Sequence, residues 1–154
     1  MSKDLKNLEV SKMYSGMSER EVLGSILLKS ELLELVNKFL VTKEIFYHQD
    51  HKDIWSAIYS LSKQNKVIDV STIANYLGEK GLKITYYLTG IVNNVISPKN
   101  IEHHAKIIYN LYVRRELWKK LHKFISRLDK ESSYQHITSD INLLTKIAEH
   151  FSQM

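Results

Sequence analysis

The sequence predicts an all-α protein, in which a six-helix globule is followed by a long helical hairpin. Its 154 residues include 5 glycines and 1 proline, fewer turn-forming residues than an all-β protein requires. Apolar residues recur at helical spacing along most of the chain. With 44% apolar residues, a chain of this length is expected to form one compact domain with an ordinary core.

The first elements follow a polar segment, residues 1–17, which we interpret as a loosely ordered leader or a weak extra helix. Ser18 and Glu21 have the spacing of a capping box, so a first helix is expected over residues 18–29. Ser30 restarts the pattern in a second helix that carries apolar residues on one side.

Four polar residues mark the starts of later elements. Thr42 opens a short turn, and Asp50 caps a third long helix. The segment Val67–Val70 is extended but has no partner run with which to form a sheet, so a packed linker is expected rather than a strand. Ser71 and Thr85 each cap a further helix.

The predicted hairpin occupies residues 98–154, after a helical globular head at residues 18–97. Ser97 precedes Pro98, which is tolerated in the first turn of a helix, and no glycine or proline interrupts the chain before the polar break Asp129–Ser133. At 1.5 Å per residue this helix would extend about 45 Å, so part of it should project from the head. A last helix then returns along it.

The long helix is apolar on more than one side, and one hairpin partner cannot cover both sides. A large exposed apolar patch is rare on a monomer, which predicts self-association through this helix. The candidate interface consists of Ile108, Leu111, Tyr112, Trp118, Leu121 and Ile125. In the alternative interpretation the hairpin folds back onto the globule, and the second apolar side is ordinary core.

The strongest cluster of charge lies on the same helix, between its apolar sides. It consists of Arg114, Arg115, Lys119, Lys120, Lys123 and Arg127. The candidates for contact with phosphate or an acidic partner are Arg114, Lys119, Lys120, Lys123 and Arg127. The formal net charge of +5 favours acidic partners or nucleic acid without requiring either. A solvated face beside a helix interface remains the alternative, because aromatic residues do not alternate with these charges.

No residue pattern indicates catalysis, and no cofactor is predicted. The segment Gly78–Gly81 lies at a helix end, without the strand that precedes a phosphate-binding loop. The serines fall mostly at expected helix caps, and none lies in a nucleophile elbow. The chain has no cysteine, which removes thiolate nucleophiles and Cys-bearing zinc sites.

Two histidine pairs are candidate metal ligands. His48 and His51 stand beside acidic residues with the local density of a metal site, but their spacing matches no recognised ligand motif, and a helix start is favoured. His103 and His104 are adjacent, so they point to different faces of a helix, and we expect one to be exposed and the other packed. No metal site is predicted.

No segment indicates export or membrane insertion. The most apolar stretch, Val22–Leu28, is far shorter than the about 20 residues that span a bilayer. We therefore expect a soluble cytoplasmic protein that does not bind membranes.

Four short motifs follow one another between Glu19 and Leu128. They are Glu19 with Val22-Leu23-Gly24 and Leu27-Leu28; Phe46-Tyr47 with His51, Ile54, Ala57 and Ile58; Ile68-Asp69-Val70 with Thr72 and Leu77; and Asn100-Ile101 with Ala105, Ile108 and Arg115. In this order and at this spacing they resemble the N-terminal domain of the DnaB-type bacterial replicative DNA helicases. The sequence departs from the family's pattern at the leader, which lacks proline, at Lys83-Ile84-Thr85, which replaces a Gly-Gly pair, and at His104, which replaces a tyrosine.

The resemblance implies the N-terminal collar of a hexameric helicase, in which the hairpins of neighbouring chains pair as dimers or as a trimer of dimers. It implies that the domain docks the C-terminal domain of primase, with a helicase loader as a further partner and only weak or indirect contact with DNA. It also implies a domain that is non-catalytic by itself, because unwinding belongs to a separate ATPase motor in this family.

Several alternatives remain open. The chain is either an excised domain of a full helicase, which its end near a hairpin boundary favours, or a free-standing helicase- or primase-interacting protein of a mobile element. The helicase-binding domain of primase has a related helical fold, but Val22-Leu23-Gly24 and Ile68-Asp69-Val70 argue against it. A basic helical DNA-binding module belongs to a different class, and predicts an affinity that falls steeply with salt and on Lys120→Glu.

Overall fold

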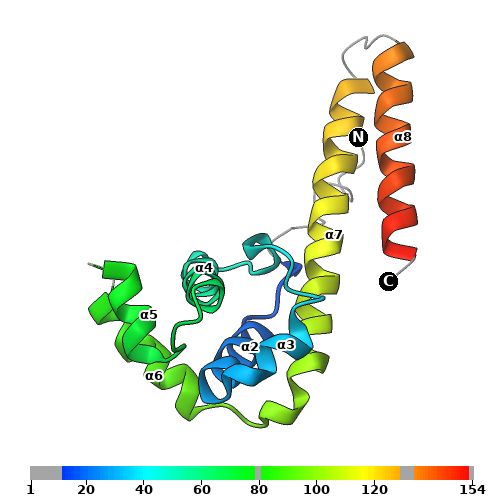
Figure 1. Ribbon diagram of the computed structural model, residues 1–154. Coiled ribbons are helices and arrows are strands. Elements are labelled where there is room, and N and C mark those ends of the chain that lie inside the picture. The colour runs from blue at the N-terminus through cyan, green and yellow to red at the C-terminus, as the bar shows by residue number, and fades with distance from the viewer. Residues whose placement is uncertain (1–11, 79–80, 129–133, 153–154) are drawn as a thin grey trace. The chain divides into compact units, whose positions relative to one another are not determined.

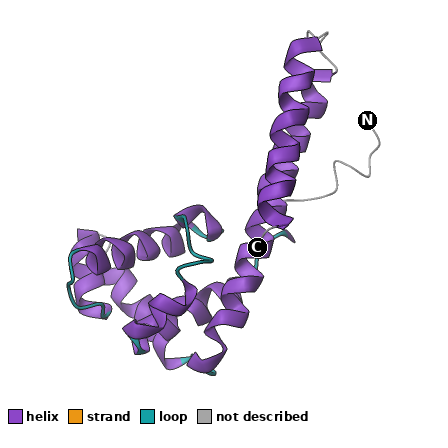
Figure 2. Cartoon of the chain, turned by 45° about the vertical axis from the view of Figure 1, so that its right-hand side comes forward, coloured by secondary structure: helices purple, strands orange, loops and turns teal. Residues whose placement is uncertain are grey.

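The computed structural model describes residues 12–78, 81–128 and 134–152. Every regular element in these ranges is an α-helix or a 3-10 helix, which confirms the predicted all-α class (Figure 1). Figure 2 shows the same absence of strands from the described part of the chain. None of the helices in these ranges combines the length and apolar character needed to cross a membrane. Most of the predicted leader, residues 1–11, lies outside the described residues.

The chain divides into two compact units, Met1–Tyr112 and Val113–Met154. The first unit contains short helices and the start of a long one; 3-10 helices carry the letter η. In chain order they are α2 (Gly16–Leu28), η2 (Ser30–Leu32), α3 (Leu33–Val36), η3 (Lys43–Ile45), α4 (Gln49–Lys63), α5 (Val70–Leu77), α6 (Gly81–Asn93), η5 (Pro98–Asn100) and the start of α7 (Ile101–Leu128).

Helix α2 is the centre of the first unit. It packs against α4, α6 and η5, and it buries polar as well as apolar residues. Helix α4 lies beside it with one apolar face, and Ile54, Trp55, Ile58 and Leu61 on that face are all buried as predicted. A helix surrounded by neighbours must satisfy its buried polar groups inside the protein, and this requirement shapes the site described below.

The start of α2 differs from the prediction. The Ser15 hydroxyl accepts a hydrogen bond from the Ser18 amide (3.2 Å), so Ser15 is the N-cap and the helix begins at Gly16. Glu21 instead accepts hydrogen bonds from the backbone amide of Ile96, at 3.1 and 3.3 Å. The predicted capping box of Ser18 and Glu21 is therefore wrong, because a serine one turn earlier caps the helix and a tertiary contact uses the carboxylate.

Helices α4 and α6 also begin before their predicted caps. The N-cap of α4 is His48, and Asp50 lies in the first turn, where a carboxylate interacts favourably with the helix dipole. Thr85 lies inside α6, and its carbonyl accepts a hydrogen bond from the Thr89 hydroxyl at 2.9 Å. Short polar side chains occur inside exposed helices as well as at their ends, so neither residue identified the start of its helix.

Helix α5 is capped by Asp69 rather than by Ser71. The Thr72 amide donates to Asp69 Oδ1 (2.7 Å), and the Asp69 amide donates to Thr72 Oγ1 (3.0 Å), which forms a reciprocal capping box. The extended residues before α5 form no strand within the described ranges, as expected of a linker.

The second predicted helix is interrupted. It forms η2 and the single turn α3, although Leu33, Val36 and Leu40 on its predicted apolar side are buried. The turn predicted at Thr42 is confirmed, because the Thr42 hydroxyl accepts a hydrogen bond from the Glu44 amide (3.4 Å) at the start of η3.

The second unit is a helical hairpin. It consists of the end of α7 and of α8 (Tyr134–Ser152), and Figure 1 shows α8 running back along the C-terminal part of α7. Pro98 lies in η5, so the α-helical part of the long segment starts at Ile101 and has 28 residues. The predicted break Asp129–Ser133 lies outside the described residues.

Candidate functional site

Glu19, His51 and Tyr87 form a hydrogen-bonded chain that joins α2, α4 and α6. Glu19 and His51 are each 1% exposed. His51 Nδ1 lies 2.5 Å from Glu19 Oε2, and His51 Nε2 lies 2.7 Å from the Tyr87 hydroxyl. The same carboxylate accepts hydrogen bonds from the backbone amides of Tyr47 (2.7 Å) and His48 (3.5 Å). One glutamate thus holds both the start of α4 and the ring of His51.

The Tyr87 hydroxyl, at one end of this hydrogen-bonded series, has a shifted pKa. Burial raises the pKa of the Tyr87 hydroxyl above its ordinary value, and the neighbouring Arg20 guanidinium opposes part of that rise. The Tyr87 hydroxyl therefore stays protonated at neutral pH; it is hydrogen-bonded to His51 Nε2, and His51 Nδ1 is hydrogen-bonded to Glu19. A phenol with a raised pKa is a poor proton donor at neutral pH, so the arrangement is suited to holding helices together rather than to proton transfer.

His48 and His51, the first pair of candidate metal ligands, make hydrogen bonds and ring contacts within the protein. Both ring nitrogens of His51 are occupied by Glu19 and Tyr87. His48 is exposed, and its ring lies edge-on to that of Tyr14, with 5.1 Å between centroids. Within the described residues, no three side chains of the metal-ligating types are grouped so that they could hold an ion.

The adjacent histidines on α7 differ in exposure as predicted, although their rings contact each other edge-on, with 5.5 Å between centroids. His103 is exposed, whereas His104 is half-buried and its Nδ1 lies 3.2 Å from the Ser18 hydroxyl of α2. His104 therefore contributes to the packing of the start of α7 within the first unit.

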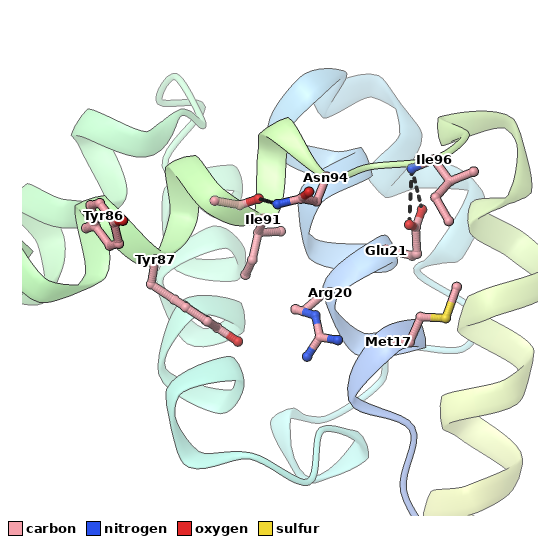
Figure 3. Close-up of a pocket in the computed structure, with 9 residues that line it drawn as sticks. Met17, Arg20, Glu21, Tyr86, Tyr87, Ile91, Asn94 and Ile96 are labelled. Carbon is pink, nitrogen blue, oxygen red and sulfur yellow. Dashed lines mark hydrogen bonds between the residues drawn. The ribbon is translucent and has the colours of Figure 1, made fainter.

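A pocket of about 520 Å³ lies between α2 and α6 (Figure 3). Its lining consists of Met17, Arg20, Glu21, Tyr86, Tyr87, Gly90, Ile91, Asn94 and Ile96. Tyr86 is 87% exposed, and Figure 3 shows Arg20 between Tyr87 and Met17. The sequence does not predict this pocket, because its two walls are helices far apart in the chain and neither carries a recognisable binding motif. Exposed tyrosine, methionine and arginine side chains are typical of protein-binding surfaces.

The candidate interface residues on α7 differ in exposure. Ile108 is 1% exposed in the single chain, so it belongs to the core of the first unit and is not available to a second chain. Leu121 is exposed, and the half-buried members of the set are Leu111, Tyr112, Trp118 and Ile125.

The basic cluster is also not uniform. Arg115 is buried, so it is not part of an exposed charged face. Arg114, Lys119 and Lys123 are exposed, whereas Lys120 and Arg127 are half-buried.

The model of the family described as "DnaB-like helicase N terminal domain" matches residues 11–110. The chain belongs to this family. The resemblance inferred from the four motifs is thereby confirmed. The matched range of this DnaB-like domain includes Glu19, His51, Tyr87 and the pocket, and it ends before the basic cluster of α7.

Curated relatives of the DnaB-like domain are replicative helicases. It is 36% identical over 110 residues to the "Probable replicative DNA helicase" of Trieres chinensis, a match that covers 69% of this chain and 24% of the relative. It is 32% identical over 104 residues to the "Replicative DNA helicase DnaC" of Bacillus subtilis strain 168, which covers 65% of this chain and 23% of the relative. The chain thus spans about a quarter of the length of these relatives.

Two solved structures have the same fold as the DnaB-like domain. The N-terminal domain of DnaB helicase from Mycobacterium tuberculosis matches with a TM-score of 0.73 and 23% identity, over 84% of this chain and 97% of that one. A DnaB-like replicative helicase, described together with its interactions with primase, matches with a TM-score of 0.72 and 22% identity, over 91% of this chain and 35% of that one.

Proposed function

We propose that this DnaB-like domain is the N-terminal collar of a replicative DNA helicase, where it holds neighbouring chains together and docks primase or a helicase loader in the cytoplasm. It acts without a cofactor and without catalysis of its own. Membership of the family supports the placement in a replicative helicase. The description of one similar structure as a helicase with its interactions with primase supports the choice of primase as partner.

The apolar surface that the hairpin leaves uncovered carries the proposal. Leu117 and Leu121 on α7 and Ile141 and Leu143 on α8 are between 39% and 49% exposed. Exposed apolar residues on both helices of a thin hairpin are best covered by another copy of the chain, since symmetric pairing is the commonest form of self-association. We propose dimers, or a trimer of dimers within a hexamer.

Trp118→Ala and Ile125→Asp are each expected to weaken self-association about 30-fold, which corresponds to about 2 kcal/mol for an interface anchor. The first change removes a large apolar side chain from α7, and the second places a charge in the apolar contact. Light scattering on a size-exclusion column, repeated over a range of protein concentrations, measures the effect.

Val67→Asp is the matched control, because Val67 is an exposed apolar residue in the linker before α5. It should leave the mass unchanged. An unchanged mass for both α7 variants would show that another surface makes the contact.

The pocket between α2 and α6 is the surface that we propose for primase. A mixture of the chain with the C-terminal domain of primase from the same source should elute as a larger species than either component. Tyr86→Ala should weaken this binding about tenfold, because it removes an exposed aromatic anchor without disturbing the core. An oligomer that ignores primase would overturn the docking role and leave self-association intact.

A further inference from the structure

The charge surplus of the chain is concentrated in one segment of α7. The formal net charge is +5. From Arg114 to Arg127 there are six basic residues and a single acidic one, Glu116. Outside this segment the chain has as many acidic as basic residues. The electrostatic attraction of the protein for an anionic partner therefore originates in this part of α7.

Three of the basic residues share one side of the helix. At about 100° per residue, Lys119, Lys120 and Lys123 fall within an arc of about 100°, which we name the lysine face. Lys119 and Lys123 are exposed and Lys120 is half-buried. The face excludes Arg115, which is buried, and Arg127, which already interacts within the chain.

The lysine face does not compete with the proposed pairing surface. By the same helical geometry, Leu121 and Ile125 fall on the opposite side of α7. A second copy that covers these apolar residues leaves the three lysines accessible. In an oligomer the lysine faces of several chains would act together on one extended partner.

Little within the segment neutralises these lysines. Glu116 forms an ion pair with Lys119 (Nζ to Oε1, 2.7 Å), and the lysine side chain is still 55% exposed. Exposed ion pairs contribute little free energy, so a phosphate can replace the carboxylate. Lysines one helical turn apart, such as Lys119 and Lys123, are about 6 Å apart at their Cβ atoms, and their flexible ammonium groups can contact successive phosphates.

We propose that the lysine face binds the phosphate backbone of nucleic acid without recognising sequence. An acidic protein surface is a poorer fit, because such an interface also needs a desolvated apolar centre, and the neighbouring apolar residues Leu121 and Ile125 lie on the other side of the helix. This activity goes beyond the collar function and does not depend on primase docking.

The test compares a triple variant, Lys119→Gln, Lys120→Gln and Lys123→Gln, with a control of equal charge change, Lys29→Gln, Lys66→Gln and Lys99→Gln. The three control lysines are exposed residues of the first unit. Fluorescence anisotropy with a labelled oligothymidylate, and with a labelled duplex of the same length, gives the affinity between about 50 and about 200 mM salt. Light scattering on each variant monitors self-association.

For the wild type we expect an affinity that falls steeply as salt rises. Neutralising the lysine face should reduce the slope of log affinity against log salt by about 2 on the single strand and by more on the duplex, because each phosphate contact contributes about 0.7 and about 0.9, respectively. The slope for the control variant should differ from that of the wild type by no more than the contribution of about one phosphate contact. Both variants should have the oligomer mass of the wild type.

An equal loss of nucleic-acid affinity in both triple variants would overturn the proposal, because the binding would then depend on net charge rather than on the lysine face. Absence of nucleic-acid binding at the lowest salt would overturn it too, as would stronger lysine-dependent binding to polyglutamate than to the oligonucleotides. A wild type that is monomeric and still binds DNA through these lysines would contradict the collar function and support the lysine face.

Discussion

Replacement of Glu19 by alanine is expected to lower the free energy of unfolding by about 3 kcal/mol. The carboxylate accepts hydrogen bonds from the Tyr47 amide and from the ring of His51 inside the first unit. The alanine variant leaves these donors without a partner, and water cannot replace the carboxylate readily at a site that is 1% exposed. Urea denaturation followed by far-UV circular dichroism measures the change.

Glu102→Ala is the control for this variant. Glu102 forms an ion pair with Lys38 (2.9 Å) whose side chains are 63% and 45% exposed for lysine and glutamate, respectively. Loss of an exposed pair should leave the free energy of unfolding nearly unchanged. If the free energy of unfolding falls by the same small amount in both alanine variants, the hydrogen bonds among Glu19, His51 and Tyr87 stabilise the fold no more than a surface ion pair does. Their structural role would then be refuted.

The helices were predictable because most of them have one apolar side and polar ends. The face of α4 that carries Ile54 and Ile58 is an example, since helical spacing alone identifies it. The long α7 was predictable for a different reason, because no glycine or proline follows Pro98 to end it.

The starts of the helices were less predictable. Ser15 and Ser18 are one turn apart and have similar capping energies, so the sequence cannot choose between them. Glu21 was assigned to a cap from its spacing, but a backbone amide far along the chain uses its carboxylate. Tertiary contacts of this kind outweigh the small differences between local caps.

The buried site was not predictable from local patterns. The sequence places Glu19 in the first of the four motifs and His51 in the second, and it offers His51 as a weak candidate for metal binding, but neither pattern indicates a contact between them. Their contact joins segments 32 residues apart, and no spacing rule relates two residues on different helices. The interpretation of α7 failed in a similar way at Ile108 and Arg115, because helical periodicity does not determine which neighbour covers a side chain.

Gly24→Ala is expected to destabilise the protein by about 2 kcal/mol, although alanine is the better helix former by about 1 kcal/mol. Gly24 lies on the side of α2 that faces Ile91 of α6 and Val95, which follows that helix. A Cβ atom at this position would lie 2.5 Å from Val95 Cγ2 and 2.8 Å from Ile91 Cγ2. Both contacts are with β-branched side chains, which have few other rotamers, so the helices must move apart.

Gly90→Ala provides a control of the same chemistry with the opposite expected sign. Gly90 lies on α6. Apart from its two chain neighbours and the backbone of its own helix, no heavy atom lies within 4 Å of a Cβ built there. Alanine at this position should therefore stabilise the protein by about 0.5 to 1 kcal/mol, through helix propensity and a less flexible unfolded chain. Urea denaturation of both variants gives the two signs. Stabilisation by both would mean that α2 and α6 separate at little cost, and a pocket between helices that separate so readily could not be a preformed docking surface.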